Sequence, residues 1–103
     1  MDIASLTKEI RKFAEARNWE KFHSPKNLSM ALICEAAELT ENFQWLTEKE
    51  SYSLPSEKLD NVKDEMADIL VYLIRMSDVL GIDLLKAAEN KIRKNGLKYP
   101  VKS

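Results

Sequence analysis

Apolar residues recur at helical spacing along four segments of this chain. In the first segment, Ile3, Leu6, Ile10 and Phe13 fall on one stripe of a helix, and the other segments repeat this spacing of three or four residues. The pattern predicts four helices, over residues 3–17, 28–46, 56–81 and 83–95. Because short connections favour antiparallel neighbours, we expect an all-α fold, namely an antiparallel four-helix bundle.

Residues that disfavour helices separate the four segments. Pro25 fits poorly inside a helix, and Ser24 or Asn27 could cap the second one. The stretch TEKESYSLPS, with one proline and three serines, interrupts the pattern before the third helix. Gly81 suits the position just past the third helix, and Gly96 is expected to stop the fourth.

The second predicted helix is apolar around more than half of its circumference. Its large apolar residues are Leu28, Met30, Leu32, Ile33, Leu39, Phe43, Trp45 and Leu46. A helix of this kind needs cover on several sides, which one layer of four short helices does not supply. We therefore predict a homo-oligomer, a dimer at least.

An acidic pair, Glu35 and Glu38, lies within this apolar helix. Because an α-helix turns about 100° per residue, Glu35 falls inside the stripe that Leu28 and Leu39 form, and Glu38 falls about 60° to one side. Glu35 is therefore expected to face the core. Glu38 is expected to lie on the border of that face.

A second acidic pair, Glu65 and Asp68, lies on the third predicted helix, where it shares a face with Tyr72. If the two helices pack antiparallel through their apolar stripes, four carboxylates converge, and their mutual repulsion would force some to protonate. A hard divalent cation removes this conflict, and oxygen ligands suit Mg²⁺, Mn²⁺ or Ca²⁺. On the residues alone, an ordinary solvated acidic face stays an equal alternative.

Composition narrows the choice of partners. The chain has 103 residues, which fits one domain over 1–103, and its net charge of −1 gives no strong attraction to nucleic acid or to an anionic membrane. No segment reaches the roughly 18 apolar residues of a membrane span. Cys34 is the only cysteine and His23 the only histidine, so a zinc site of the His/Cys type is excluded. We interpret Cys34 as a core residue of a reduced, cytoplasmic protein.

The stretch EAAELTENFQW, followed by DEMADILVYL, resembles the MazG-like, all-α nucleoside triphosphate pyrophosphohydrolases. Their signature is an ExxE helix, a spacer and an E/DxxD helix. Glu35 and Glu38 match the first half, and Glu65 and Asp68 match the second. The segments NWEKFHSPKNL and KYPV resemble the dCTP pyrophosphatase branch, so the similarity covers roughly residues 6–101.

The resemblance implies hydrolysis of a nucleoside triphosphate to the monophosphate and pyrophosphate, in house-cleaning of the dNTP pool. It implies Mg²⁺, with Mn²⁺ as a possible substitute, held by Glu35, Glu38, Glu65 and Asp68. Glu38, with Glu35, is the implied catalytic residue, and Glu38 would orient or deprotonate the attacking water. The resemblance also implies sites shared between subunits, usually in a tetramer, which agrees with the oligomer expected from the apolar faces.

The same resemblance implies substrate contacts. Trp19 and Trp45 match aromatic residues of the base pocket, where a base can stack on a ring. His23 ends a matching substrate-contacting segment, and Tyr72 matches a tyrosine near the sugar. For each of these residues, packing in the core, in an interface or in a loop is the alternative.

The resemblance extends to the terminal segment and has one departure, in the first helix. Lys91, Asn95 and Lys98 match polar groups that meet the triphosphate, with a solvated basic tail as the alternative. Ile10 stands where that branch often has a histidine in the base pocket. A strict preference for dCTP is therefore open, and dATP or modified pyrimidine triphosphates remain candidates.

Two other functions compete with this one. The helical pattern and broad apolar faces also fit a non-enzymatic helical interaction or regulatory module, in which the acids are ordinary surface residues. A third interpretation is a related activity on another phosphorylated metabolite, such as phosphoribosyl-ATP. The tryptophans and the KYPV ending favour the dNTP branch over it.

Overall fold

The chain is built of helices joined by short turns. The structure, a computed structural model, describes residues 1–102, so Ser103 of the expected domain lies outside it. The described residues form no strand, which confirms the all-α class. The elements are α1 (Ile3–Ala16), the 3₁₀-helix η1 (Glu20–Phe22), α2 (Pro25–Glu41), α3 (Glu48–Ser51), α4 (Ser56–Leu80) and α5 (Leu84–Lys98).

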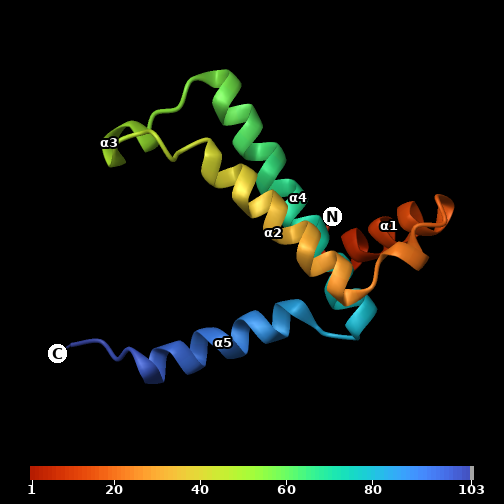
Figure 1. Cartoon of the computed structure of the whole chain (residues 1–103). Helices are drawn as coiled ribbons and strands as arrows, with labels where there is room; N and C mark the ends of the chain where they lie inside the picture. The colour runs from red at the N-terminus through yellow and green to blue at the C-terminus, as the bar shows by residue number, and fades with distance from the viewer. Residues whose placement is uncertain (103) are drawn as a thin grey trace.

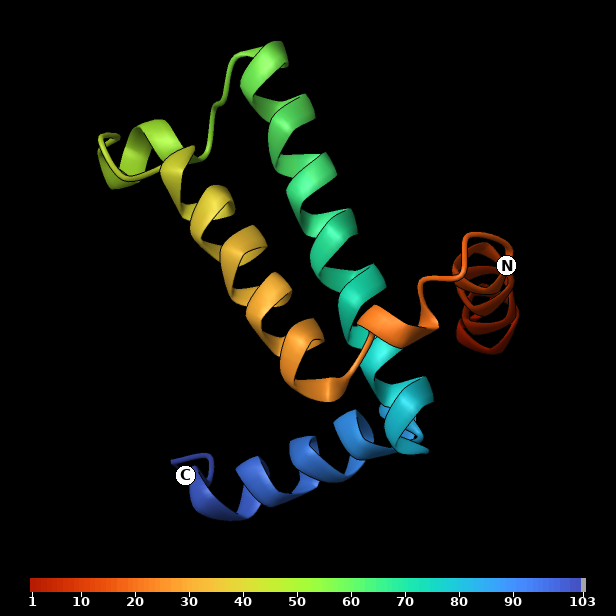
Figure 2. The same cartoon turned by 45° about the vertical axis from the view of Figure 1, so that its right-hand side comes forward.

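An antiparallel pair of long helices, α2 and α4, forms the centre of the molecule. The two helices lie side by side, with the short α3 in the connection at one end of the pair (Figures 1 and 2). Helix α1 packs against α4, and η1 leads from α1 back to the start of α2. The buried apolar residues Ala14, Leu28, Val62 and Ile74 come from these three helices. This pairing fixes which residues of α2 and α4 can meet.

The helix ends agree in part with the sequence pattern. Ser24 caps α2, where its Oγ accepts a hydrogen bond of 3.1 Å from the backbone N–H of Asn27, and Pro25 occupies the first helical position. The first helical position needs no backbone N–H, so a proline is accommodated there. The helix therefore begins three residues earlier than expected. Gly81 closes α4 in the left-handed conformation, with φ of 68°, as predicted.

The other end of α2 was predicted wrongly. The helix ends at Glu41, not at residue 46, and Asn42 becomes its C-cap, with its side-chain amide donating to the backbone carbonyl of Glu38 at 3.1 Å. The apolar residues of 43–46 keep helical spacing although they lie in turns. The connection that follows also holds the short helix α3, whose capping box joins Thr47 and Glu50.

Gly96 does not stop the last helix, which continues through it to Lys98. A helix tolerates one glycine at a cost of about 1 kcal/mol, whereas a proline disfavours helical backbone at the residue before it. Tyr99, which precedes Pro100, is the C-cap. The helix therefore ends at the proline.

A single chain does not close into the expected four-helix bundle. Helix α5 leaves the end of α4 and does not lie along α2 or α4 (Figures 1 and 2). The accessible surface is 8328 Å², whereas a compact globule of 11.9 kDa would expose about 6,000 Å². Cys34, expected in the core, is exposed on α2 because, within residues 1–102, no helix covers that face. Within residues 1–102, no helix is both long and apolar enough to cross a membrane.

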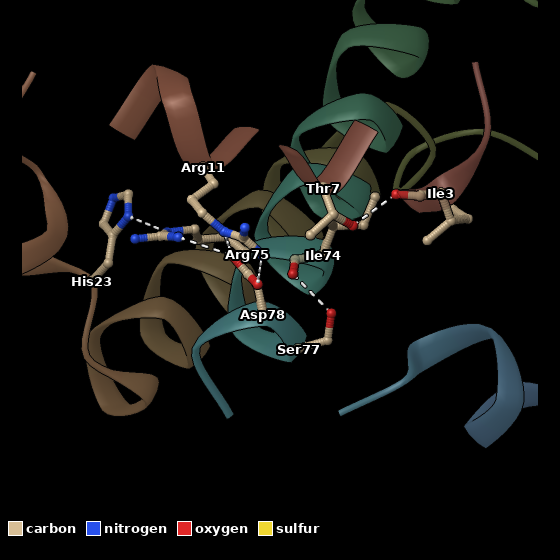
Figure 3. A network of polar contacts seen from close by, with 8 residues as sticks. All are labelled: Ile3, Thr7, Arg11, His23, Ile74, Arg75, Ser77 and Asp78. Atoms are coloured by element: carbon tan, nitrogen blue, oxygen red, sulfur yellow. Dashed lines mark hydrogen bonds and ion pairs between the residues drawn. The ribbon is translucent and has the colours of Figure 1, made fainter. Parts of the chain in front are cut away.

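A polar network ties α1 to α4 and to the segment before α2 (Figure 3). Arg11 donates to both carboxylate oxygens of Asp78, at 2.9 and 2.6 Å, and Arg75 donates to Asp78 at 3.3 Å. The Arg11 guanidinium is the main cause that lowers the pKa of Asp78. Arg75 also donates from Nε to Nδ1 of His23 at 3.0 Å. These contacts join α1 and the segment before α2 to the C-terminal part of α4.

We predict that Gly81→Ala lowers the free energy of unfolding by about 1–2 kcal/mol, because an added Cβ disfavours left-handed backbone. The effect would come from the backbone alone, since a Cβ at Gly81 would meet no atom within 4 Å. Chemical denaturation followed by circular dichroism measures it.

Gly96→Ala is the matched control. It lies within α5, also has open space for a Cβ and has no positive φ, so we expect unchanged or slightly higher stability. If both variants lost the same free energy of unfolding, the left-handed backbone of Gly81 would not be the cause.

Candidate active site

Three carboxylates meet where α2 and α4 pack together. One oxygen each of Glu35, Glu38 and Glu65 lies within 4.8 Å of the others. Glu35 and Glu65 are half-buried, whereas Glu38 is exposed, which matches the placement expected from the helical angles. The packing of α2 on α4 thus brings Glu65 of α4 together with Glu35 and Glu38 of α2.

The cluster holds more negative charge than its surroundings compensate. The pKa of Glu65 is raised from 4.5 to about 7, first by its hydrogen bond with Glu35, then by burial and by Glu38. Its Oε2 is buried and has no hydrogen-bond partner. Neither of the two ion pairs in the described residues involves these acids. A buried oxygen without a partner beside two further carboxylates is a donor set that fits a hard divalent cation.

A cavity of about 210 Å³ lies between α1, the segment before α2, and α4. Trp19, His23 and Tyr72 line it, so the structure brings together three of the predicted substrate-binding residues. Phe13 meets Trp19 edge to face, with 5.6 Å between ring centroids. Burial raises the pKa of Tyr72, and the charges of Glu35 and Asp68 raise it further, so the hydroxyl stays protonated at neutral pH.

Asp68 differs from the other three predicted metal ligands. It lies outside the group of carboxylates within 4.8 Å of one another and instead lines the cavity beside Tyr72. Asp68 therefore stands on the same helix as Glu65, one turn along α4, at the wall between the acidic cluster and the aromatic cavity.

The remaining predicted site residues are not brought together within one chain. Trp45 is 87% exposed, in the turn after α2. Lys91, Asn95 and Lys98 are exposed on α5, which projects from the rest of the molecule (Figure 1). None of the four lines the cavity or belongs to the carboxylate cluster.

Sequence reasoning did not single out Arg75, the cation in the cavity wall. Its side chain is almost fully buried, and Asp78 lies three residues further along the same helix. An arginine inside the apolar run LVYLIRM, followed by an acid at helical spacing, was the available signal. Ile10, the position singled out in the sequence, also lines this cavity.

Burial and the charge of Arg75 lower the pKa of His23. The histidine is therefore neutral at pH 7, and its Nδ1 accepts the hydrogen bond from Arg75. The cavity thus has an aromatic wall, a neutral histidine and the carboxylate of Asp68, which stands one turn from Glu65 of the acidic cluster.

Comparison with known proteins agrees with this geometry. The chain is 37% identical to dCTP pyrophosphatase 1 of Mus musculus over 102 residues, and 39% identical to that of Homo sapiens over 103 residues. These matches cover 97% and 96% of this chain, which spans 58% of each relative. The crystal structure of a pyrophosphatase from Archaeoglobus fulgidus matches with a TM-score of 0.90 and 37% identity, over 95% of this chain and 92% of that one.

The family model described as the MazG-like family matches residues 31–103, which include both acidic pairs. Together with the relatives above, this match confirms the resemblance that the acidic motifs carry. The chain belongs to the MazG-like family.

Proposed function

We propose that this chain is a Mg²⁺-dependent nucleoside triphosphate pyrophosphatase, which hydrolyses (d)NTP to (d)NMP and pyrophosphate in house-cleaning of the nucleotide pool. The observation that carries this proposal is the cluster of Glu35, Glu38 and Glu65 beside an aromatic cavity. Relatives named dCTP pyrophosphatase 1 support dCTP or a related dNTP as the substrate.

The residues present fit a magnesium site. Glu35, Glu38 and Glu65 would hold the ion, and Asp68, one turn from Glu65, would complete the set when substrate is present. Mn²⁺, which takes the same ligands, would be a substitute. The ion would offset the charge that develops on the phosphate oxygens during cleavage.

The chain's own residues supply the rest of the chemistry. Cleavage of the anhydride between the α- and β-phosphates requires water to attack phosphorus in line with the bond that breaks, while one water proton passes to a base. Glu38 is suited to that role, because it is the exposed member of the cluster and stands beside Glu35. Trp19 and Tyr72 would hold the base and sugar in the adjacent cavity.

A second copy of the chain would complete the site. The surface of one chain exceeds that of a compact globule by roughly 2,300 Å², which is the scale of an obligate interface. Large apolar residues of α5, including Ile92 and Leu97, are exposed. We propose a homo-oligomer, with a tetramer favoured, in which Trp45 and the polar residues Lys91, Asn95 and Lys98 reach a neighbouring chain's cluster.

We predict that the chain releases pyrophosphate from at least one member of a dNTP panel in the presence of Mg²⁺, and none in EDTA. Glu38→Gln should lower kcat by about 10²- to 10⁴-fold, the usual contribution of a general base, and keep the helical content. A coupled pyrophosphate assay and circular dichroism measure the two quantities.

Glu41→Gln is the control, because Glu41 is an exposed acid one turn further along α2 and lies outside the cluster. It should keep wild-type turnover. If the wild type turns over no common or modified (d)NTP, the proposed function is wrong.

The raised pKa of Glu65 predicts a pH dependence of stability in the metal-free protein. Between 4.5 and about 7 the folded chain keeps a proton that the unfolded chain has released. The free energy of unfolding should therefore fall as pH rises through this range, and Glu65→Gln should remove that fall. Thermal melting at about pH 5 and about pH 8 in EDTA tests this.

Mg²⁺ should raise the melting temperature of the wild type at the higher pH and have a smaller effect on Glu65→Gln, which lacks one anionic ligand. Metal-free wild type that is equally stable at both pH values would contradict the repulsion inferred for the cluster.

We predict that inactive variants complement each other if each site is built from two chains. One parent carries Glu38→Gln, and the other carries Lys91→Ala with Asn95→Ala. After mixing and subunit exchange, some sites combine the intact cluster of one chain with the intact α5 of another, so activity should exceed the mean of the two parents. Activity equal to that mean would place the whole site within one chain.

A further inference from the structure

Arg75 is a buried cation in the wall of the aromatic cavity. Only 6% of the residue is exposed, and a buried charge costs free energy unless it is paired. Asp78, one turn along α4, supplies the pairing charge at 3.3 Å and is itself held by two hydrogen bonds from Arg11 on α1. Figure 3 shows this line of contacts from α1 through Asp78 and Arg75 to His23. The guanidinium is therefore fixed in place before any ligand binds.

The contact with Arg75 determines where His23 carries its proton. The Nε of Arg75 lies 3.0 Å from Nδ1 of His23, and a guanidinium has five donors and no acceptor. Nδ1 must accept this bond with its lone pair, so the single proton of the neutral ring is on Nε2. Within the described residues, no hydrogen bond uses Nε2.

His23 is thereby a hydrogen-bond donor in a mostly apolar cavity. Its ring lies near Trp19, with 6.1 Å between ring centroids, and both side chains line the cavity. At about 210 Å³ the cavity is smaller than the roughly 300–1,000 Å³ of sites for drug-sized ligands, so it suits one base better than a whole nucleotide. A base that offers an acceptor to Nε2–H gains a bond that other bases do not gain.

We propose that Arg75 is a positioning residue that holds His23 in the Nε2–H form, and that this donor makes the cavity select bases with a hydrogen-bond acceptor on the edge facing it. The selection rests on the proposed function, because it assumes that the cavity receives the base of a nucleotide. The fixed tautomer does not rest on it.

The tautomer is measured on the complete protein by ¹⁵N NMR. His23 is the only histidine, so its two ring nitrogens give the only imidazole signals. Wild type should show a protonated Nε2 and an unprotonated Nδ1 at neutral pH. Arg75→Met should give a mixture of tautomers, and Arg75→Lys, which keeps a donor, should restore the wild-type form.

A proton on Nδ1 in the wild type, or a spectrum of Arg75→Met identical to that of the wild type, would overturn the proposal. Neither outcome depends on turnover, so the test of Arg75 is separate from the test of pyrophosphatase activity.

Base selection is measured by calorimetric titration with the four dNMPs, which need not be hydrolysed. Arg75→Met should weaken binding of the preferred dNMP roughly tenfold, the value of one hydrogen bond, and change the poorest one little. His23→Phe should reduce the difference in affinity between the preferred and the poorest dNMP to a similar extent. The double variant of Arg75→Met and His23→Phe should bind the preferred dNMP no more weakly than either single variant.

If Arg75→Met weakened the binding of all four dNMPs equally, Arg75 would contact the phosphate directly, and the proposed base selection would be wrong. An additive loss in the double variant would show that Arg75 and His23 act independently. A circular dichroism melt of each variant confirms that it is folded before titration.

Discussion

Repulsion between carboxylates at the contact of α2 and α4 is the constraint on which the rest of the structure depends. The two helices pack through apolar stripes that also contain Glu35 and Glu65, so the burial that stabilises the pair also brings negative charges together. The unpaired oxygen of Glu65 is the local sign of this conflict. Apolar packing thus holds the acids in place at a cost that a bound cation would offset.

Much of this arrangement could be predicted because it follows from helical periodicity. Angles along a helix placed Glu35 inward and Glu38 at the border, and antiparallel packing of α2 on α4 was the condition under which the acids would converge. Periodicity could not locate the end of α2, because the apolar residues after Glu41 continue the spacing although they form turns. The role of Gly96 was also misjudged, since Pro100 ends the last helix.

The cavity was harder to predict, because it depends on how α1 crosses α4. Trp19, His23 and Tyr72 were candidates only through family resemblance, and the contact of Arg75 with His23 joins residues 52 positions apart in the chain. Helical spacing reports which residues share a face of one helix. It does not report the angle between two helices, or which side chains of two helices meet, as Arg11 of α1 and Asp78 of α4 do here.

The separation of α5 from the rest of its own chain has a consequence for how the protein can evolve. Gly81 turns the chain sharply after α4, and α5 then makes few contacts with the other helices. Substitutions on α5 therefore disturb the folding of the chain very little, whereas substitutions on α2 or α4 disturb the core and the acids together. Sequence drift in α5 can therefore change the surfaces and side chains that one chain presents to another while the packing of α2 on α4 stays intact.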